Sequence, residues 1–167
     1  MAEKEYSGNN FSLREDVTDA IKRLDPKQQI SVIRAALNQA AQSIIQAGRK
    51  KLRSKHPRLA KSKAYWDGKS TVQHFKKKVH RDLLEQGITV YLADYRALFV
   101  DVGTVERQTH PVSTVGNPKY RMTKAHSTGS IAASHWWKEA LDENKEMIQN
   151  NLLAKAQEMI IKKWNNG

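Results

Sequence analysis

The chain has 167 residues, no cysteine and a formal net charge of +12 at pH 7. This length fits one domain that buries a core unaided, and the lack of cysteine excludes disulfides, thiolate metal sites and cysteine nucleophiles. The start is polar, without the apolar run of a secretory signal, and no stretch approaches the roughly 20 apolar residues that span a bilayer. These features predict a soluble protein of a reducing or indifferent compartment.

The chain is expected to begin with two helices. Residues 1–10 are polar and rich in Gly and Asn, which predicts a disordered tail before a single domain over 11–167. A short helix should run from Ser12 to Leu24, with Ser12 as its cap. Asp25-Pro26 then starts a second helix that reaches about Ser54. Its predicted core side consists of Ile30, Ile33, Leu37, Ala40, Ala41, Ile44 and Gly48.

The positive charge gathers in one segment. Residues 49–81 hold 13 Lys and Arg against one Asp, which equals the whole net charge. Within it, residues 50–64 are expected to be mobile, because like charges repel and Pro57 interrupts a helix. Such a segment suits nucleic-acid phosphates or an acidic protein surface, and Tyr65 and Trp66 add rings for base stacking. The predicted contact residues are Arg49, Lys50, Lys51, Arg53, Lys55, Arg58, Lys61 and Lys63, with Lys69 beyond them.

An antiparallel sheet of about four strands is expected after this segment. Strands are predicted over 72–84, 88–92 and 98–102, with a turn at Glu85-Gln86-Gly87. A further pair is expected around 104–109 and 119–123, within a long loop over about 105–130 that is of a length typical of functional loops. Together with two long helices and the short first helix, this sheet predicts an α+β fold.

The third predicted strand carries the sequence Ala-Leu-Phe-Val-Asp-Val-Gly-Thr over residues 97–104. Strand alternation would place Phe99, Asp101 and Gly103 on one face, with Thr104 following them. Asp101 is a candidate active-site acid together with Asp94 and Glu106. A structural carboxylate paired with Lys78 or Arg81 explains it equally well.

Other catalytic patterns are missing from the sequence. The six histidines form no i,i+4 pair and no His-Glu-x-x-His string, and no glycine-rich phosphate loop opens a helix. We therefore expect no catalytic residue, no metal, no cofactor and no enzymatic activity.

A closing helix is expected from about His135 to Trp164, with Ser134 as its cap. Trp136 and Trp137 point about 100° apart on a helix, so only one joins the core stripe. The other is either a partly exposed ring or an anchor at a subunit contact. The predicted stripe consists of Trp137, Leu141, Ile148, Leu152, Ala156, Met159 and Lys163.

Three motifs keep a particular order along the chain. Arg34-Ala-Ala-Leu-Asn-Gln-Ala-Ala leads to Arg49-Lys-Lys, Phe99-Val-Asp-Val-Gly-Thr follows, and Trp136-Trp-Lys-Glu-Ala-Leu-Asp comes last. Over roughly residues 28–160 this order resembles the lambdoid gene-product-ten-like family of tailed-phage minor tail, neck and tail-completion proteins. In that family Glu is usual where Asp101 stands, and Pro-Phe where His135-Trp136 stands.

The resemblance implies a non-enzymatic virion protein that joins head to tail or completes the tail. It would form a homo-oligomeric ring, contact the head connector and the tail-tube or terminator proteins, and involve no membrane. A ring around a DNA channel would give the cationic surface two possible partners, DNA or an acidic connector protein. It would reside in the virion tail or neck, and in the host cytoplasm during assembly. The alternative is a basic nucleic-acid-binding module that uses residues 49–81.

Overall fold

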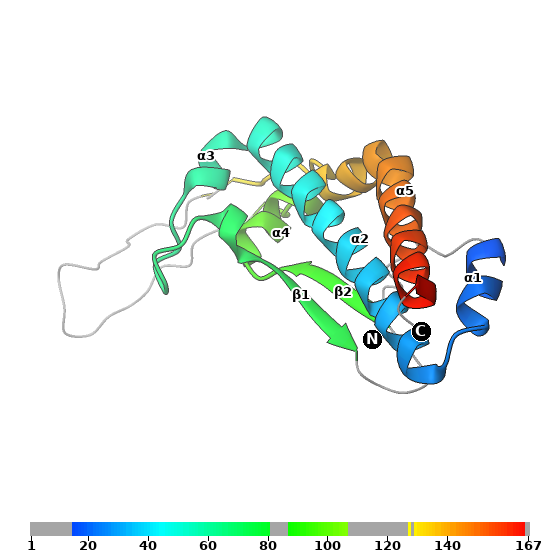
Figure 1. The fold of residues 1–167 in the computed structure, drawn as a ribbon. Coiled ribbons are helices and arrows are strands. Elements are labelled where there is room, and N and C mark those ends of the chain that lie inside the picture. Colours follow the sequence, from blue (N-terminus) through cyan, green and yellow to red (C-terminus); the bar gives the residue numbers. More distant parts are fainter. Residues whose placement is uncertain (1–14, 81–86, 107–126, 128, 166–167) are drawn as a thin grey trace, which may run out of the picture. The chain divides into compact units, whose positions relative to one another are not determined.

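The computed structural model describes residues 15–80, 87–106, 127 and 129–165 (Figure 1). Helices combined with an antiparallel sheet confirm the α+β class. Where the sequence predicted one domain, the contacts divide the chain into two compact units. The first unit joins the chain up to Ala93 with the chain from Trp136, and the second is Asp94–His135. The elements of the first unit are α1 (Glu15–Lys22), α2 (Pro26–Lys55), α3 (Pro57–Lys61), the 3-10 turn η1 (Thr71–His74), β1 (Phe75–His80), β2 (Gly87–Leu92) and α5 (Trp136–Asn165), and the second unit holds α4 (Tyr95–Val102).

Helix α2 begins as the sequence predicts. The Asp25 carboxylate accepts hydrogen bonds from the backbone N–H groups of Lys27 and Gln28, at 2.9 and 3.0 Å, and Pro26 is the first helical residue. These contacts satisfy donors that have no partner within the first turn. The cap and the proline together fix where the helix starts.

The buried side of α2 differs in part from the predicted one. Ala40, Ala41 and Gly48 are buried as expected, whereas the four larger predicted residues are only half-buried. Helix α2 packs against α5, α3 and both strands, so its apolar residues are covered from several directions. The predicted but half-buried residues are Ile30, Ile33, Leu37 and Ile44, and the buried ones that the prediction missed are Val32, Ala36, Ile45, Ala47 and Leu52.

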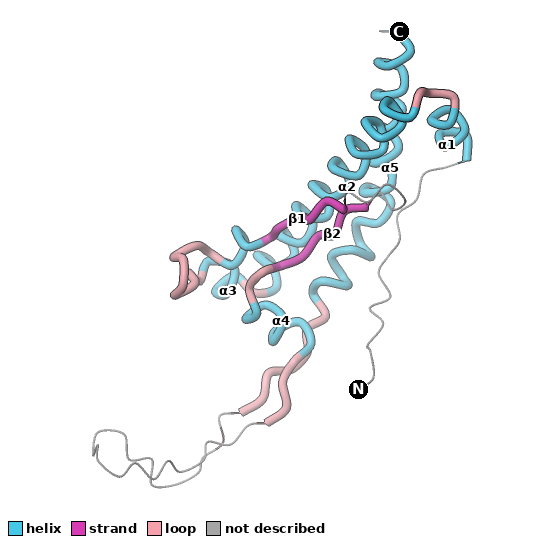
Figure 2. The backbone as a smooth tube through the Cα atoms, turned by 90° about the horizontal axis from the view of Figure 1, so that it is seen from below, coloured by secondary structure: helices cyan, strands magenta, loops and turns pink. Residues whose placement is uncertain are grey.

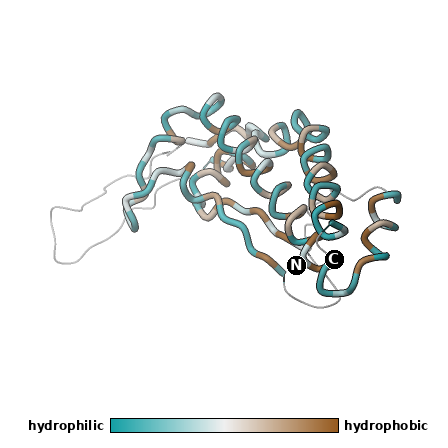
Figure 3. The backbone as a smooth tube through the Cα atoms, viewed as in Figure 1, coloured by the Kyte–Doolittle hydropathy of each residue, from teal (hydrophilic) through white to brown (hydrophobic). Residues whose placement is uncertain are grey.

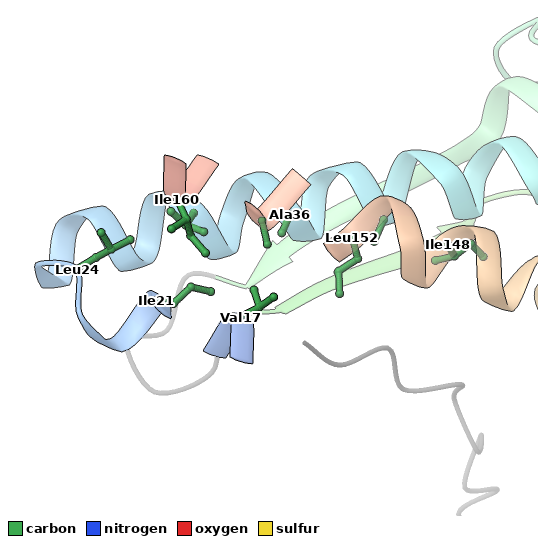
Figure 4. Packing of buried hydrophobic residues seen from close by; sticks show 10 residues of the cluster. Val17, Ile21, Leu24, Ala36, Ile148, Leu152 and Ile160 are labelled. Atoms are coloured by element: carbon green, nitrogen blue, oxygen red, sulfur yellow. The ribbon is translucent and has the colours of Figure 1, made fainter. Parts of the chain in front are cut away.

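The main core is the seam, the contact between α2 and α5, and α1 covers one end of it (Figures 1 and 4). Alanines on both helices let the two axes approach closely, and larger aliphatic side chains fill the space between them. Residues 12–14 of the predicted first helix lie outside the described residues. The core cluster consists of Val17, Ile21, Leu24, Val32, Ala36, Ala40, Ile148, Leu152, Ala156 and Ile160.

Helix α5 buries one row of residues spaced by four. Ile148, Leu152 and Ala156 are buried as predicted, and the row continues to Trp136 and Ile160. The other predicted stripe residues, Trp137, Leu141, Met159 and Lys163, are half-buried on a neighbouring side. The predicted buried side of α5 is therefore rotated by part of a helical turn from the observed one.

One polar contact interrupts the apolar seam. The Asn151 side-chain amide of α5 donates a hydrogen bond to the Ser43 hydroxyl of α2 at 2.9 Å. The same hydroxyl donates to the Gln39 carbonyl one turn earlier, at 3.2 Å. Ser43 is buried, so this pairing satisfies its polar atom within the protein.

The two adjacent tryptophans have different surroundings. Trp136 is 2% exposed, while Trp137 is half-buried, with its ring centre 5.7 Å from that of Phe75. A Cβ atom on Gly48 would lie 2.5 Å from the Trp137 ring, so that ring packs directly onto the α2 backbone. The structure favours a buried Trp136 and a partly exposed Trp137 that packs within its own chain.

Strands β1 and β2 form an antiparallel hairpin that lies along α2 (Figures 1 and 2). Phe75 is opposite Leu92, and His80 is opposite Gly87. The strand predicted over 72–84 begins later, because residues 71–74 form η1. Its end and the first two residues of the predicted turn lie outside the described residues, and Gly87 of that turn is the first residue of β2. Among the described residues the sheet has two strands, not the predicted four.

The motif at residues 97–104 is a helix followed by a glycine, so the predicted third strand is wrong. The Asp94 carboxylate accepts a hydrogen bond from the Arg96 backbone N–H and caps α4, which ends at Gly103 with φ of 78°. A short apolar run fits a strand or a helix equally well by pattern alone. The capping acid before it and the glycine after it, whose positive φ stops the helix, favour the helix.

Close backbone contacts hold the chain around Gly103. A Cβ atom there would lie 2.8 Å from both the Ala133 nitrogen and the Ile131 oxygen. Thr104 forms an isolated antiparallel bridge with Ile131. Of the strand pair predicted around 104–109 and 119–123, residues 107–109 and 119–123 lie outside the described residues. The predicted cap residue Ser134 donates its hydroxyl and its backbone N–H to the Val100 carbonyl. At position 103, only glycine allows the backbone of Ile131 and Ala133 to lie this close without being displaced.

Candidate interaction surface

The basic segment predicted to be mobile is helical over most of its length. Residues 50–55 are the last turns of α2, and α3 starts at Pro57 directly after His56. Proline is tolerated there because the first helical N–H has no partner within the helix. Figure 3 shows this stretch as mostly hydrophilic. The two helices therefore hold each of their cations on a defined side.

Two of the predicted contact residues face α5. Lys51 lies 3.0 Å from the Glu139 carboxylate and 2.5 Å from that of Glu143, and Lys55 lies 2.7 Å from Glu139. Hydrogen bonds from Lys55 and Lys51 hold the pKa of Glu139 below its ordinary value, and Glu143 and Glu139 raise the pKa of Lys51. These lysines join the ends of the two long helices.

Arg49 also serves the fold, because its Nε donates to the Val72 carbonyl at 3.0 Å. Lys63 lies in an isolated bridge with Ser70. The remaining four predicted contact residues are exposed and form no ion pair with any described residue. They are Lys50, Arg53, Arg58 and Lys61.

The tip loop, residues 63–70, presents two neighbouring aromatic rings. Tyr65 is 87% exposed and Trp66 is 41% exposed, and their ring centres lie 5.0 Å apart, edge to face. The loop is closed by hydrogen bonds from the Ala64 N–H to the Lys69 carbonyl and from the Gly68 N–H to the Ala64 carbonyl, both 2.8 Å. The two rings therefore stand on a closed turn.

Asp67 fixes the tip loop to η1. Its carboxylate lies 3.0 Å from the buried His74 Nε2 and accepts a hydrogen bond from the Lys69 backbone N–H at 3.0 Å. That backbone N–H is the largest cause of the lowered pKa of Asp67, and His74 adds to it. The Trp66 ring lies 5.7 Å from the His74 ring. The base of the loop is thus tied to a buried residue.

A second basic surface lies on the hairpin. Lys76 and Lys78 are exposed on the face that also carries Tyr91, whereas Lys77 faces the other way and donates to the Asn38 side chain at 2.8 Å. Strand alternation produces this division. The sequence analysis counted these lysines in the charged segment but did not separate them, although a two-residue period on β1 was the signal for it.

The three predicted acids have separate surroundings. Asp94 is buried, and its carboxylate lies 2.7 Å from the Arg96 guanidinium. The hydrogen bond with Asp94 raises the pKa of Arg96. Glu106 accepts a hydrogen bond from the Ser127 hydroxyl. Asp101 lies half-buried on α4; of its predicted partners, Arg81 is outside the described residues and Lys78 belongs to the other unit. Within the described part of the chain, no group of three His, Asp or Glu is arranged to hold a metal ion.

Helix α4 exposes an apolar stripe. Tyr95, Leu98, Phe99 and Val102 follow the i, i+3, i+4, i+7 spacing of one helix side and are 36–49% exposed. The Tyr95 and Phe99 rings contact each other edge to face, with centres 5.7 Å apart. Two of the predicted motif residues, Phe99 and Asp101, are therefore on a helix, and Phe99 belongs to its exposed side.

The search for relatives found no match among protein-family models, curated proteins or solved structures. None of the described helices contains an apolar stretch long enough to cross a membrane.

Proposed function

We propose that this protein is a non-enzymatic assembly component of a tailed-phage virion, which forms a homo-oligomeric ring at the head–tail junction or the tail end. The order of its parts supports this role: a long helix with a basic end, a hairpin, the Gly103-Thr104 motif and a closing helix that begins with tryptophans. Because the Gly103-Thr104 motif follows a helix and not the predicted strand, it supports the proposal only through its position along the chain.

The exposed stripe of α4 is the observation that carries the proposal. A helix with its apolar side uncovered is typical of a docking element, because such a side gains free energy when a partner covers it. A ring needs two different patches that meet head to tail. A second exposed apolar surface, Ile161 and Trp164 near the end of α5, belongs to the other unit.

Light scattering over a concentration series, with negative-stain imaging, tests the ring. We expect the wild-type protein to form closed oligomers and Val102→Asp to shift them to monomers, because the charge would be buried at the contact. Val105→Asp is the matched control, since Val105 is 81% exposed and lies outside the stripe. A wild-type protein that stays monomeric, alone and with connector or tail-tube protein, would refute the proposal.

Nucleic-acid binding is the second candidate function. The four exposed cations of the basic segment and the aromatic tip loop favour it, since phosphates and bases match those two chemistries. We expect binding to DNA that weakens with salt. Lys50→Gln/Arg53→Gln should bind more weakly than wild type and with a shallower salt dependence. Lys138→Gln/Lys145→Gln removes the same charge from exposed positions of α5 and should have a smaller effect.

A further inference from the structure

Tyr65 has an unusual position for an aromatic residue. It is the most exposed of the large apolar side chains of the described residues, at 87%, and its only ring contact given by the structure is with Trp66. Such a ring gains little from folding, because burial is what stabilises aromatic side chains. Its exposure calls for an explanation outside the core.

The turn under Tyr65 is held in place before any partner binds. Two backbone hydrogen bonds close the tip loop, Gly68 supplies a positive φ of 69°, and Asp67 ties the turn to the buried His74. A ring on such a preorganised turn loses little conformational freedom when it stacks against a ligand. The loop is therefore built to present Tyr65.

The charges near the tip are cationic. Arg58 and Lys61 precede the loop and are exposed, and Lys69 follows the two rings. Asp67, the single acid of residues 49–81, contacts His74, the Lys69 N–H and, at 3.9 Å, the Lys69 ammonium, and the cations near the tip outnumber it. The surroundings of Tyr65 favour an anionic partner.

We propose that the tip loop is a base-stacking element for single-stranded nucleic acid, with Tyr65 as the stacking ring and Lys61 and Lys69 as phosphate contacts. Single strands offer both flat ring faces and phosphates, whereas a duplex hides its base faces within its own stack. An acidic protein surface matches the lysines but offers no base to Tyr65. This inference rests on nucleic-acid binding, the second candidate function.

Fluorescence anisotropy with a labelled oligothymidylate tests the proposal. Tyr65→Ala should bind roughly tenfold more weakly, as expected for the loss of one base–aromatic stack, while Tyr65→Phe keeps the ring and the affinity. Val105→Ala is the control, because it removes a highly exposed apolar side chain that lies outside both basic surfaces and outside the stripe of α4. Lys61→Gln/Lys69→Gln should reduce the slope of log affinity against log salt by about 1.4, the value for two phosphate contacts to a single strand.

Competition experiments separate the possible partners. Unlabelled oligothymidylate should compete better than a duplex of equal length, and better than polyglutamate or phosphatidylserine vesicles. Equal affinity of Tyr65→Ala and wild type would overturn the stacking role while leaving nucleic-acid binding intact. A preference for duplex, polyglutamate or vesicles would overturn it too, and no binding to any DNA would remove both this inference and the second candidate function.

Discussion

The seam and the exposed stripe of α4 place similar residues in opposite surroundings. In the seam, Ile148 and Leu152 of α5 are buried within the core cluster that α5 forms with α2 and α1. On α4, Leu98 and Val102 remain about half exposed. Two helices of 30 residues each can cover one another along their length, whereas the described part of the second unit contains only one helix, of eight residues. We infer from this difference that the seam stabilises the fold, whereas the stripe of α4 can bind a partner.

The same substitution on both helices gives the strongest test of this comparison. Leu152→Ala should lower the free energy of unfolding by about 2–5 kcal/mol, because it leaves a cavity in the seam. Leu98→Ala on α4 should change it by less than about 0.5 kcal/mol in the monomer, since its side chain is already exposed. Urea unfolding of both variants measures the two effects, and similar losses would contradict the comparison.

Within the second unit, Gly103 is expected to matter more than its exposed stripe. Gly103→Ala should cost about 3 kcal/mol, because the residue adopts a glycine-specific conformation and its Cβ would meet the backbone at Ile131 and Ala133. Gly129→Ala is the matched control: Gly129 has a similar φ of 75° but nothing within 4 Å of its Cβ position. Hydrogen exchange of the amides of Thr104 and Ser134 reports the local loss, which should be clearly smaller in the control.

The sign of the stability change in Gly48→Ala tests how tightly the aromatic rings pack against α2. Alanine is normally more stable than glycine inside a helix. Gly48→Ala should nevertheless lower stability by about 1–3 kcal/mol, because the new methyl would overlap the rings of Trp137 and Phe75. Thermal unfolding measures the change. A stabilised variant would show that these rings can move away from α2.

The ion pairs at the end of the seam should have the smallest effect, and one that depends on pH. A carboxyl with a lowered pKa stabilises the fold above its unfolded pKa, and this contribution disappears as the pH falls through the folded value. Glu139→Gln should therefore lower the midpoint temperature of thermal unfolding at pH 7. It should not lower that temperature at a pH well below 4.5, the ordinary pKa of a glutamate. Glu146→Gln, on an exposed residue of α5 without an ion pair among the described residues, should show no such difference.

Local signals predicted much of the first unit. The Asp25-Pro26 start of α2, strand β2 and the extent of α5 all follow from caps and periodic patterns that act within a few residues. The motif at 97–104 misled because its eight residues fit two periods, although Asp94 just before it is a local signal for a helix. The contacts that require a glycine at position 103 come from residues 131 and 133. Such contacts between distant parts of the chain leave no local pattern.

The candidate surface was predictable only as a total charge. The division between Lys50 and Arg53, which face solvent, and Lys51 and Lys55, which face α5, depends on two glutamates 84 and 92 residues further along the chain. The exposed ring of Tyr65 was predicted as a stacking candidate, but its support by Asp67 and His74 needed the fold. Sequence reasoning therefore located the surface without resolving which side chains compose it.

The hydrogen bond between Asn151 and Ser43 has a consequence for the alignment of the helix pair. Apolar contacts have no direction, so sliding α5 by one turn, about 5.4 Å, would still place apolar side chains against one another. The amide and the hydroxyl meet in one alignment alone, and separating them would cost about 1–3 kcal/mol. The hydrogen bond between Asn151 and Ser43 therefore determines which turn of α5 lies opposite the end of α2. That alignment in turn determines which lysines pair with glutamates of α5 and which can contact a partner.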